Sequence, residues 1–522
     1  MWSNTISLSS LRAAGDPIKG YEGAASGVVP VMKVLEDSFT YANQLGQRQG
    51  AGAVYLNVFH PDIVAFLSTK KENADEKIRV KTLSLGLVVP DKFYELARND
   101  DFMYLFSPYD VKREYDIDFA YLDITEMYDE MLNNPNIRKS KIKARELENE
   151  ISKLQQESGY PYILNVDTAN RENPIDGRIL MSNLCSEIIQ VQKPSIINDN
   201  QTYEEMGTDI SCNLGSTNIP RLMESSDFGK SIGTMVRALT YVTDNTSIDA
   251  VPTVKKGNNE AHTIGLGAMG LHAFLAKNQI HYGSEEALDF TNIYFMLMKY
   301  HSLRESNLIA TEKEVVFTGF EKSKYADGSY LHKYVEKEWQ PETDKVREIF
   351  KDIFVPSPKD WQELSDNIQM SGIYHQNLMA VAPNGSIGYV SETTSSLHPI
   401  TQRIEERQEK KTGKTYYPAP YLSDETIPYY KTAYETDMRL VIDTYAVAQQ
   451  HIDQGMSLTL FMNSEVPEGM YEWKDSNNKF TTRDLNILRH YAHKRGIKST
   501  YYVRTYTADG ESGANECESC SI

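Results

Sequence analysis

The sequence predicts an α/β protein with a largely parallel sheet, either open or closed into a barrel. Short apolar runs typical of buried strands alternate with amphipathic helical patterns along most of the 522 residues. The intervals between these runs are too uneven for a regular eightfold barrel. With 40% hydrophobic and 24% charged residues, the chain has ample material for a hydrophobic core.

In the first third of the chain, strands and helices are expected to alternate. A helix is expected from Pro30 to about Gln44, because apolar residues recur there at helical spacing. A second, charged helix is expected over 138–156. The glycine-rich segment 44–52 carries one arginine and is either a nucleotide-contacting loop or a plain connector. The strands expected in this part are 5–8, 53–57, 82–88 and 162–165.

The remaining chain continues the pattern, with a helix expected over 482–495. Residues 263–270 contain the dinucleotide-binding pattern G-x-G-x-x-G. We reject that function because the pattern follows a polar segment and precedes an amphipathic helix, so the glycines are expected to permit close helix packing. The strands expected here are 209–212, 378–382, 456–461 and 498–504.

The net charge of −19 argues against a nucleic-acid or membrane surface as partner, because both are anionic. No apolar run approaches the roughly 18 residues of a membrane span. Residues 1–5 lack the basic and apolar regions of a signal peptide. We therefore expect a cytoplasmic protein without direct nucleic-acid or membrane contacts.

The stretch 182–188 is the strongest candidate for chemistry. It places Asn183, Cys185 and Glu187 at alternate positions, so an extended segment would put all three on one face about 7 Å apart. An amide can hold a hydroxyl, a carboxylate can take its proton, and a thiol can do nucleophilic, redox or radical chemistry. The alternative is a half-buried strand in which Cys185 is only a small core residue.

The cysteines give a second signal. Four cysteines in this length do not make a disulfide scaffold. Cys517 and Cys520 form a C-x-x-C pair near the carboxy-terminal end, where the composition after Thr505 is typical of a flexible tail. A zinc site would need two more ligands and the tail has no histidine, so an exchange-active dithiol is favoured.

The segment from Pro383 to Ile387 follows an apolar run and contains glycine and serine ahead of a possible helix start. Such a segment can cradle a phosphate with backbone amides. An ordinary turn is the equal alternative.

Together these motifs resemble the large, catalytic subunit of class I ribonucleotide reductase, and within it the class Ib branch. The resemblance covers nearly the whole chain. It rests on motifs that occur in the family's order: Asn183-Leu184-Cys185-Ser186-Glu187, Ser211-Cys212-Asn213-Leu214-Gly215, Ala382-Pro383-Asn384-Gly385-Ser386-Ile387, Tyr501-Tyr502 and Cys517-Glu518-Ser519-Cys520.

The resemblance implies the family's ten-stranded α/β barrel over 1–505, with the Cys185 loop at its centre, and a flexible redox tail over 506–522. It implies the radical reduction of ribonucleoside diphosphates to 2′-deoxyribonucleoside diphosphates for DNA synthesis. Cys185 would be the transient thiyl radical that takes the 3′ hydrogen. Glu187 would accept the proton of the 3′ hydroxyl, and Asn183 would hydrogen-bond the substrate's hydroxyls.

Other roles follow from the same resemblance. Cys212 would be one of two thiols that reduce the 2′ carbon, and Cys517 and Cys520 would reduce the resulting disulfide. Tyr501 and Tyr502 would relay the radical. The substrate would contact the residues of the two central motifs, namely Asn183, Leu184, Cys185, Ser186, Glu187, Pro383, Asn384, Gly385, Ser386 and Ile387. The specificity effectors, ATP or a deoxynucleoside triphosphate, would contact two loops through Arg12, Lys19, Gln44 and Arg48.

The resemblance also implies partners. A metal-containing small subunit would generate the radical, a thioredoxin- or glutaredoxin-like protein would recycle the tail, and two large subunits would form a homodimer. No metal is expected in this chain. The family's second reducing cysteine, first barrel strand and amino-terminal helical domain correspond to nothing here, so we expect an incomplete barrel that a separate amino-terminal fragment completes.

Two rival interpretations remain. One is another thiyl-radical or glycyl-radical enzyme, which leaves the paired tyrosines unexplained. The other is a non-catalytic, nucleotide-binding remnant of a reductase. Retention of the four cysteines, both tyrosines, Asn183 and Glu187 argues against the second.

Overall fold

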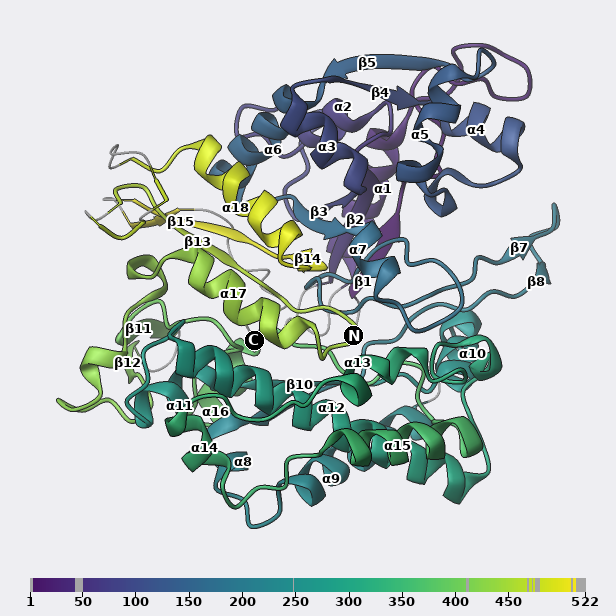
Figure 1. The fold of residues 1–522 in the computed structure, drawn as a ribbon. Helices are drawn as coiled ribbons and strands as arrows, with labels where there is room; N and C mark the ends of the chain where they lie inside the picture. Colours follow the sequence, from purple (N-terminus) through teal and green to yellow (C-terminus); the bar gives the residue numbers. More distant parts are fainter. Residues whose placement is uncertain are drawn as a thin grey trace.

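The computed structural model describes residues 3–42, 50–246, 248–409, 413–466, 469–471, 473–474, 479–507 and 510–512. The chain forms two parts: residues 3–171 fill the upper part of Figure 1, and most of residues 214–400 fill the lower part. Elements from the carboxy-terminal end lie between the two. In the described part of the chain, no helix is long and apolar enough to cross a membrane.

The upper part is built on a five-stranded sheet. Its first four strands are parallel, and the fifth, which comes from the carboxy-terminal end, is antiparallel to its neighbour. The four strands expected in this part are confirmed, with ends that differ by one or two residues. In spatial order the strands are β1 (Ser3–Ser7), β2 (Ala51–Asn57), β3 (Ser84–Val89), β6 (Tyr162–Asn165) and β14 (Ser499–Thr500).

Helices cover this sheet because its central strands β2 and β3 are buried on both faces. The helix expected from Pro30 begins slightly earlier and ends at Tyr41. In chain order the helices are α1 (Val28–Tyr41), α2 (Ile63–Ser68), α3 (Asp91–Asn99), α4 (Pro108–Tyr115), α5 (Ile124–Asn133), α6 (Ala144–Ser158) and α7 (Val166–Arg171).

The helix expected over 138–156 is only partly present. Residues 139–143 form a strand, β5 (Lys139–Lys143), and helix α6 starts at Ala144. Strand β5 pairs antiparallel with β4 (Phe102–Phe106), so tertiary pairing overrides the local helical pattern. Its lysines suit an edge strand, because charge discourages further pairing.

The lower part contains a shorter parallel pair, β9 (Leu214–Asn218) and β10 (Gly265–Met269). Single parallel bridges continue from it, between Leu266 and Met379 and between Val381 and Met456. The segments 378–382 and 456–461 therefore run beside their neighbours as expected, although only Leu460–Asn463 (β13) is a regular strand among them.

Two expectations about this part are wrong. Residues 209–212 are not a strand, because Asp209 pairs with the start of a helix: its N–H donates to Thr253 O at 3.1 Å, and Thr253 Oγ1 donates to its Oδ2 at 2.6 Å. Gly265 and Gly267 lie in β10 and not at a helix contact, whereas Gly270 is the N-cap of α11 (Leu271–Lys277). A Cβ at Gly267 would lie 2.3 Å from Ala380 O, so this glycine permits two strands to approach closely.

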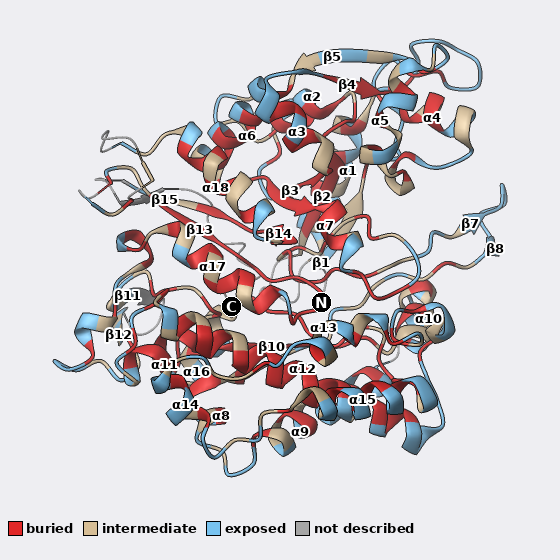
Figure 2. Ribbon diagram, viewed as in Figure 1, coloured by how far each residue is buried: buried red, intermediate tan, exposed pale blue. Residues whose placement is uncertain are grey.

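Helices surround this shorter sheet. Figure 2 shows that the long helix α12 (Glu285–Lys313) is buried over most of its length, which makes it the centre of the lower core. The other helices of this part are α8 (Ile219–Met223), α9 (Phe228–Asn245), α10 (Pro252–Ala261), α11 (Leu271–Lys277), α13 (His332–Glu336), α14 (Asp344–Phe350), α15 (Pro358–Ser371) and α16 (Gly385–Val390).

The carboxy-terminal segment joins the two parts (Figure 1). Helix α17 (Met438–Gln449) packs on α12, and α18 (Thr482–Lys494) packs on α6. Helix α18 confirms the helix expected over 482–495. It begins with a capping box, in which Thr481 Oγ1 accepts from Asp484 N and Asp484 Oδ2 accepts from Thr481 N.

The strand expected over 498–504 is interrupted. Strand β14 ends at Thr500 and β15 (Val503–Thr507) begins after the two tyrosines. The chain then returns as β16 (Gly510–Ser512), antiparallel to β15. Residues 506–507 and 510–512 of the expected flexible tail therefore lie in strands, and residues 513–522, with Cys517 and Cys520, lie outside the described residues.

The remaining described strands form small hairpins, β7 (Ile196–Ile197) with β8 (Tyr203–Glu205) and β11 (Ile404–Glu409) with β12 (Gly413–Pro418). Within the described residues the strands form separate sheets, and no closed ring of ten strands is present. The fold is thus a mixed α/β architecture whose two parts meet around the carboxy-terminal strands.

Candidate active site

The stretch that carries Cys185 is a tight turn and not an extended segment. Ser186 N donates to Asn183 O at 3.2 Å, and Ser186 has a φ of +67°. A non-glycine residue in the left-handed region is uncommon and needs support from its surroundings. The expected spacing of about 7 Å along one strand face is therefore wrong, because a turn brings the ends of the stretch together.

Side chains from distant parts of the chain support this turn. Ser499 Oγ donates to Ser186 O at 2.6 Å, and Ser457 Oγ donates to Cys185 O at 2.6 Å. Gly455 N donates to Glu187 O at 2.8 Å. Because all three donors come from the carboxy-terminal segment, that segment fixes the position of the thiol between the two parts of the fold.

Two adjacent tyrosines lie next to the turn. The Tyr501 hydroxyl donates to Cys185 Sγ over 3.7 Å, and the ring centroids of Tyr501 and Tyr502 are 4.1 Å apart. The pair occupies the break between β14 and β15. Tyr501 N donates to Leu458 O at 2.7 Å, which holds the pair against the neighbouring segment. Both side chains are buried, so thiol, first phenol and second phenol form one continuous contact chain.

The amide of Asn183 organises the other side of the turn. Its Oδ1 accepts from the backbone N–H groups of Glu187 and Ile188, each at 3.0 Å. With the oxygen so used, the amide NH₂ is left as a donor. Hydrogen bonds from Asn183 lower the pKa of both Glu187 and Cys212, so its side chain lies within reach of both groups.

Burial raises the pKa of Glu187 to about 7, against the opposing effect of hydrogen bonds from Asn183 and Ser457. A carboxyl with this pKa exchanges its proton near neutral pH, as a general base must. Ser457 Oγ, the same hydroxyl that holds the Cys185 carbonyl, lies 3.4 Å from Glu187 Oε2. Ser457 therefore contacts both the Cys185 backbone and the Glu187 carboxyl.

Cys212 is exposed as a residue. Surrounding protein atoms nevertheless desolvate its sulfur and raise the pKa of the thiol to about 12, and the charge of Glu187 adds to this shift. The thiol is therefore protonated at neutral pH. The structure thus brings together four of the predicted residues, Asn183, Cys185, Glu187 and Cys212, with Tyr501 and Tyr502 behind them.

A helix starts within the segment 383–387, as expected. Asn384, with a φ of +54°, is the N-cap of the short helix α16, and its Oδ1 accepts from Ser216 Oγ at 3.1 Å. A Cβ added at Gly385 would meet nothing within 4 Å, so this position faces open space. The first N–H groups of a helix lack intrahelical acceptors, which leaves donors for a ligand here.

The predicted effector residues are only partly described. Arg12 and Lys19 lie on an exposed loop, where the Arg12 guanidinium is 5.2 Å from the centroid of the Tyr109 ring. Gln44 and Arg48 lie outside the described residues.

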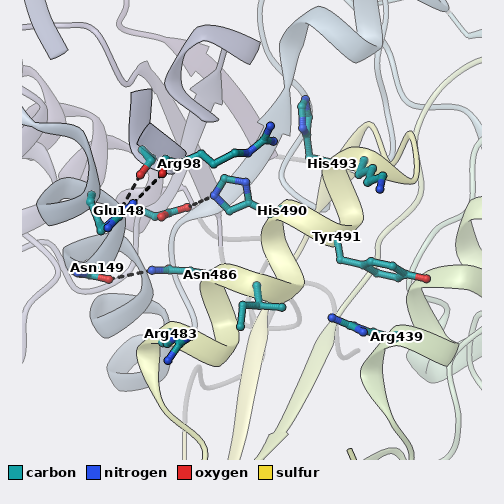
Figure 3. A pocket seen from close by; sticks show the side chains of 13 residues that line it. Arg98, Glu148, Asn149, Arg439, Arg483, Asn486, His490, Tyr491 and His493 are labelled. Carbon is teal, nitrogen blue, oxygen red and sulfur yellow. Dashed lines mark hydrogen bonds and ion pairs between the residues drawn. The ribbon is translucent and has the colours of Figure 1, made fainter. Parts of the chain in front are cut away.

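Sequence reasoning missed a basic cavity. It has a volume of about 1010 Å³ and lies among α3, α6, α17 and α18. Figure 3 shows the side chains that line it, with His490 and Asn486 of α18 turned toward Glu148 and Asn149 of α6. Its cationic residues are Arg98, Arg145, Arg439, Arg483 and Lys494. The basic residues along 483–495 were a signal, but only the fold adds those of α3 and α6.

Sequence reasoning also missed Tyr160 and Tyr162, whose rings lie next to Tyr501 and Tyr502. The Tyr162 ring lies 4.8 Å from that of Tyr501, and the Tyr160 ring lies 5.4 Å from that of Tyr502. In the sequence these two tyrosines are part of an ordinary apolar strand start, so only the three-dimensional fold could associate them with Tyr501 and Tyr502.

The chain was compared with known proteins. Residues 5–503 match the family described as ribonucleotide reductase, barrel domain. The chain is 47% identical over 528 residues to a ribonucleoside-diphosphate reductase subunit alpha of Mycoplasma pneumoniae, an alignment that covers 99% of this chain and 71% of the relative. It is 45% identical over 520 residues to the subunit alpha of Bacillus subtilis, covering 99% and 72%. The chain therefore belongs to the ribonucleotide reductase family.

Proposed function

We propose that this chain is the catalytic subunit of a class Ib ribonucleoside-diphosphate reductase, which reduces ribonucleoside diphosphates to 2′-deoxyribonucleoside diphosphates. The relatives at 45–48% identity, all named ribonucleoside-diphosphate reductase subunit alpha, support this reaction. The observation that carries the mechanism is the contact between the Tyr501 hydroxyl and Cys185 Sγ, with the Tyr502 ring against Tyr501.

Oxidation reaches the substrate through this contact. A radical delivered to Tyr502 moves to Tyr501, and Tyr501 then takes the hydrogen atom of the Cys185 thiol. The Cys185 thiyl takes the 3′ hydrogen of the ribose. Glu187 accepts the proton of the 3′ hydroxyl, which its pKa of about 7 permits near neutral pH. The Asn183 amide, within reach of Glu187 and Cys212, donates to the substrate's hydroxyls.

Cys212 serves the reducing half of the reaction. Its thiol, with a pKa of about 12, keeps its proton and can deliver hydrogen to the 2′ carbon. It ends as a disulfide with a second thiol, which we propose comes from an amino-terminal fragment of the large subunit. Cys517 and Cys520 then reduce that disulfide, and a thioredoxin- or glutaredoxin-like protein recycles them.

The diphosphate is held by residues 383–387. The open space at Gly385 and the N–H donors at the start of α16 support this assignment. The specificity effector, ATP or a deoxynucleoside triphosphate, binds through Arg12, Lys19, Gln44 and Arg48. Two copies of the large subunit form a homodimer.

The metal-containing small subunit supplies the radical, and we place its docking at the basic cavity. Helix α18, which lines the cavity, ends at Lys494, and the tyrosine pair follows shortly after it in the chain. An acidic segment of the partner would match the arginines of the cavity in a chain that is otherwise strongly acidic.

The test is an assay of the purified chain with the small subunit, effector and reductant, with and without an amino-terminal fragment of a relative. Deoxynucleoside diphosphate is expected only when both partners are present. No product in any combination would contradict the proposed reaction. Sustained turnover without the fragment would contradict the fragment alone.

A further inference from the structure

Four buried tyrosines contact one another at the end of the proposed relay. Besides the pair Tyr501 and Tyr502, the cluster contains Tyr160 and Tyr162, whose ring centroids are 5.2 Å apart. Both contact Tyr502, at 5.4 Å and 5.2 Å between centroids. An oxidising equivalent on Tyr502 can therefore move in two directions. Tyr501 leads toward Cys185, whereas Tyr160 and Tyr162 lead away from it.

Hydroxyl groups link Tyr160 directly to Tyr502. Tyr162 Oη donates to Ser84 Oγ at 3.4 Å, and Ser84 Oγ donates to Tyr160 Oη at 3.3 Å. The Tyr160 and Tyr502 hydroxyls are 3.3 Å apart. Because Tyr160 accepts from Ser84, its own proton can be donated to Tyr502. The hydroxyl of Tyr162 donates to Ser84 and also has a hydrogen bond with Tyr502.

The side reaction is a hydrogen-atom transfer. The O–H bond of Tyr160 breaks, the O–H bond of Tyr502 forms, and the electron moves with the proton. The products are a Tyr160 phenoxyl radical and a reduced Tyr502, so the oxidising equivalent no longer reaches Cys185.

A cation covers the ring of Tyr160. Lys70 Nζ lies 4.6 Å from the ring centroid. Two backbone carbonyls hold the ammonium there, since Nζ donates to Lys81 O at 2.7 Å and to Leu83 O at 3.0 Å. A positive charge over a ring face stabilises the electron-rich ring and opposes the removal of an electron from it. Burial of the Tyr160 ring reduces the screening of this charge by water.

We propose that Lys70 is a positioning residue that keeps the oxidising equivalent on Tyr502 and Tyr501 by making Tyr160 harder to oxidise. This inference rests on the proposed function, because it needs Tyr502 to carry a radical. Lys70 acts through Tyr160 and touches neither substrate nor thiol.

The test uses the enzyme assembled with its small subunit, substrate, effector and reductant. Lys70→Gln keeps N–H donors for the two carbonyls but removes the charge, and Lys70→Arg keeps both. Turnover is expected to fall at least about tenfold in Lys70→Gln and to stay within about threefold of the parent in Lys70→Arg.

Double variants separate this role from a structural one. Phenylalanine cannot form a phenoxyl radical, so Lys70→Gln combined with Tyr160→Phe should recover the turnover of Tyr160→Phe alone. Lys70→Gln combined with Tyr162→Phe is the matched control and should stay low. With a fluorotyrosine at position 160, electron paramagnetic resonance of samples frozen during turnover should show fluorine hyperfine splitting in Lys70→Gln and none with Lys70 intact.

The proposal is overturned if Lys70→Gln turns over like the parent, if Tyr160→Phe fails to relieve its defect, or if the fluorine splitting is absent. Tyr502→Phe distinguishes this failure from failure of the proposed function. If Tyr502→Phe is inactive, the relay stands and only the role of Lys70 falls. If Tyr502→Phe turns over normally, the relay is wrong and the role of Lys70 falls with it.

Discussion

Cys185 and Cys212 are two thiols of one site with different surroundings. Cys185 sits in a turn that Ser457 and Ser499 hold, and a phenol hydroxyl points at its sulfur. Cys212 keeps accessible surface beside Asn183 and Glu187, and its pKa is raised to about 12. In the proposed mechanism, position relative to an oxidisable neighbour gives Cys185 the radical role, while Cys212 keeps its hydrogen for donation.

The largest expected effect separates the two thiols directly. Cys185→Ser should abolish turnover and also the exchange of a 3′ hydrogen label from the substrate, by at least about 10³-fold, because no thiyl can form. Cys212→Ser should also stop net reduction but leave the 3′ label exchange, since that step needs only Cys185. Equal loss of label exchange in both variants would contradict the division of roles.

Tyr501→Phe and Tyr502→Phe come next. Each removes an oxidisable hydroxyl with little change of shape, so turnover should fall at least about 10²-fold. The thermal midpoint should change by less than about 3 °C, because the buried ring is retained. If the thermal midpoint drops strongly and the remaining turnover matches the remaining fraction of folded protein, the two tyrosines serve packing instead.

Glu187 should impose a pH dependence that neither thiol can. Its carboxyl must be ionised to accept a proton, so the rate should rise with pH through about 7, and Glu187→Gln should lose this limb together with at least about tenfold in rate. Burial makes the pKa of Glu187 higher in the folded state than in the unfolded state. The free energy of unfolding therefore falls as pH rises from the unfolded-state pKa toward about 7. Glu187→Gln should therefore be more stable than the parent at pH 8, by on the order of 3 kcal/mol in chemical denaturation.

The smallest effect concerns Ser457. Ser457→Ala removes the hydrogen bond to the Cys185 carbonyl and the contact with Glu187. We expect a loss of about 1 kcal/mol in unfolding free energy and a rate reduced about threefold, because the turn keeps its other donors. Ser464→Ala, at a half-buried residue just after β13, is a suitable control. An unchanged rate in Ser457→Ala would show that the other donors alone position the thiol.

Much of the upper sheet could be predicted from the sequence, because continuous apolar runs such as 53–57 have few alternatives to a buried strand. The turn at Cys185 could not, since alternation of polar and apolar residues indicates an extended strand, and the donors that bend the chain lie about 270 to 313 residues away at Ser457 and Ser499. The chemistry proposed for the site rests on residue types and on motifs that resemble a family. Nothing in the sequence pointed to Lys70 and Tyr160, because only the fold brings Tyr160 to Tyr502 and Lys70 to the Tyr160 ring.

The most direct test of the central claim is to trap the oxidising equivalent at Tyr501. An aminotyrosine at position 501 is easier to oxidise than tyrosine, so it should hold the radical before Cys185 is reached. Electron paramagnetic resonance of the assembled enzyme with substrate and effector should then show an aminotyrosyl radical, which Tyr502→Phe abolishes and Cys185→Ser does not. Loss of the small-subunit radical without any radical at position 501, or a radical there that is indifferent to Tyr502→Phe, would contradict the relay from Tyr502 through Tyr501 to Cys185.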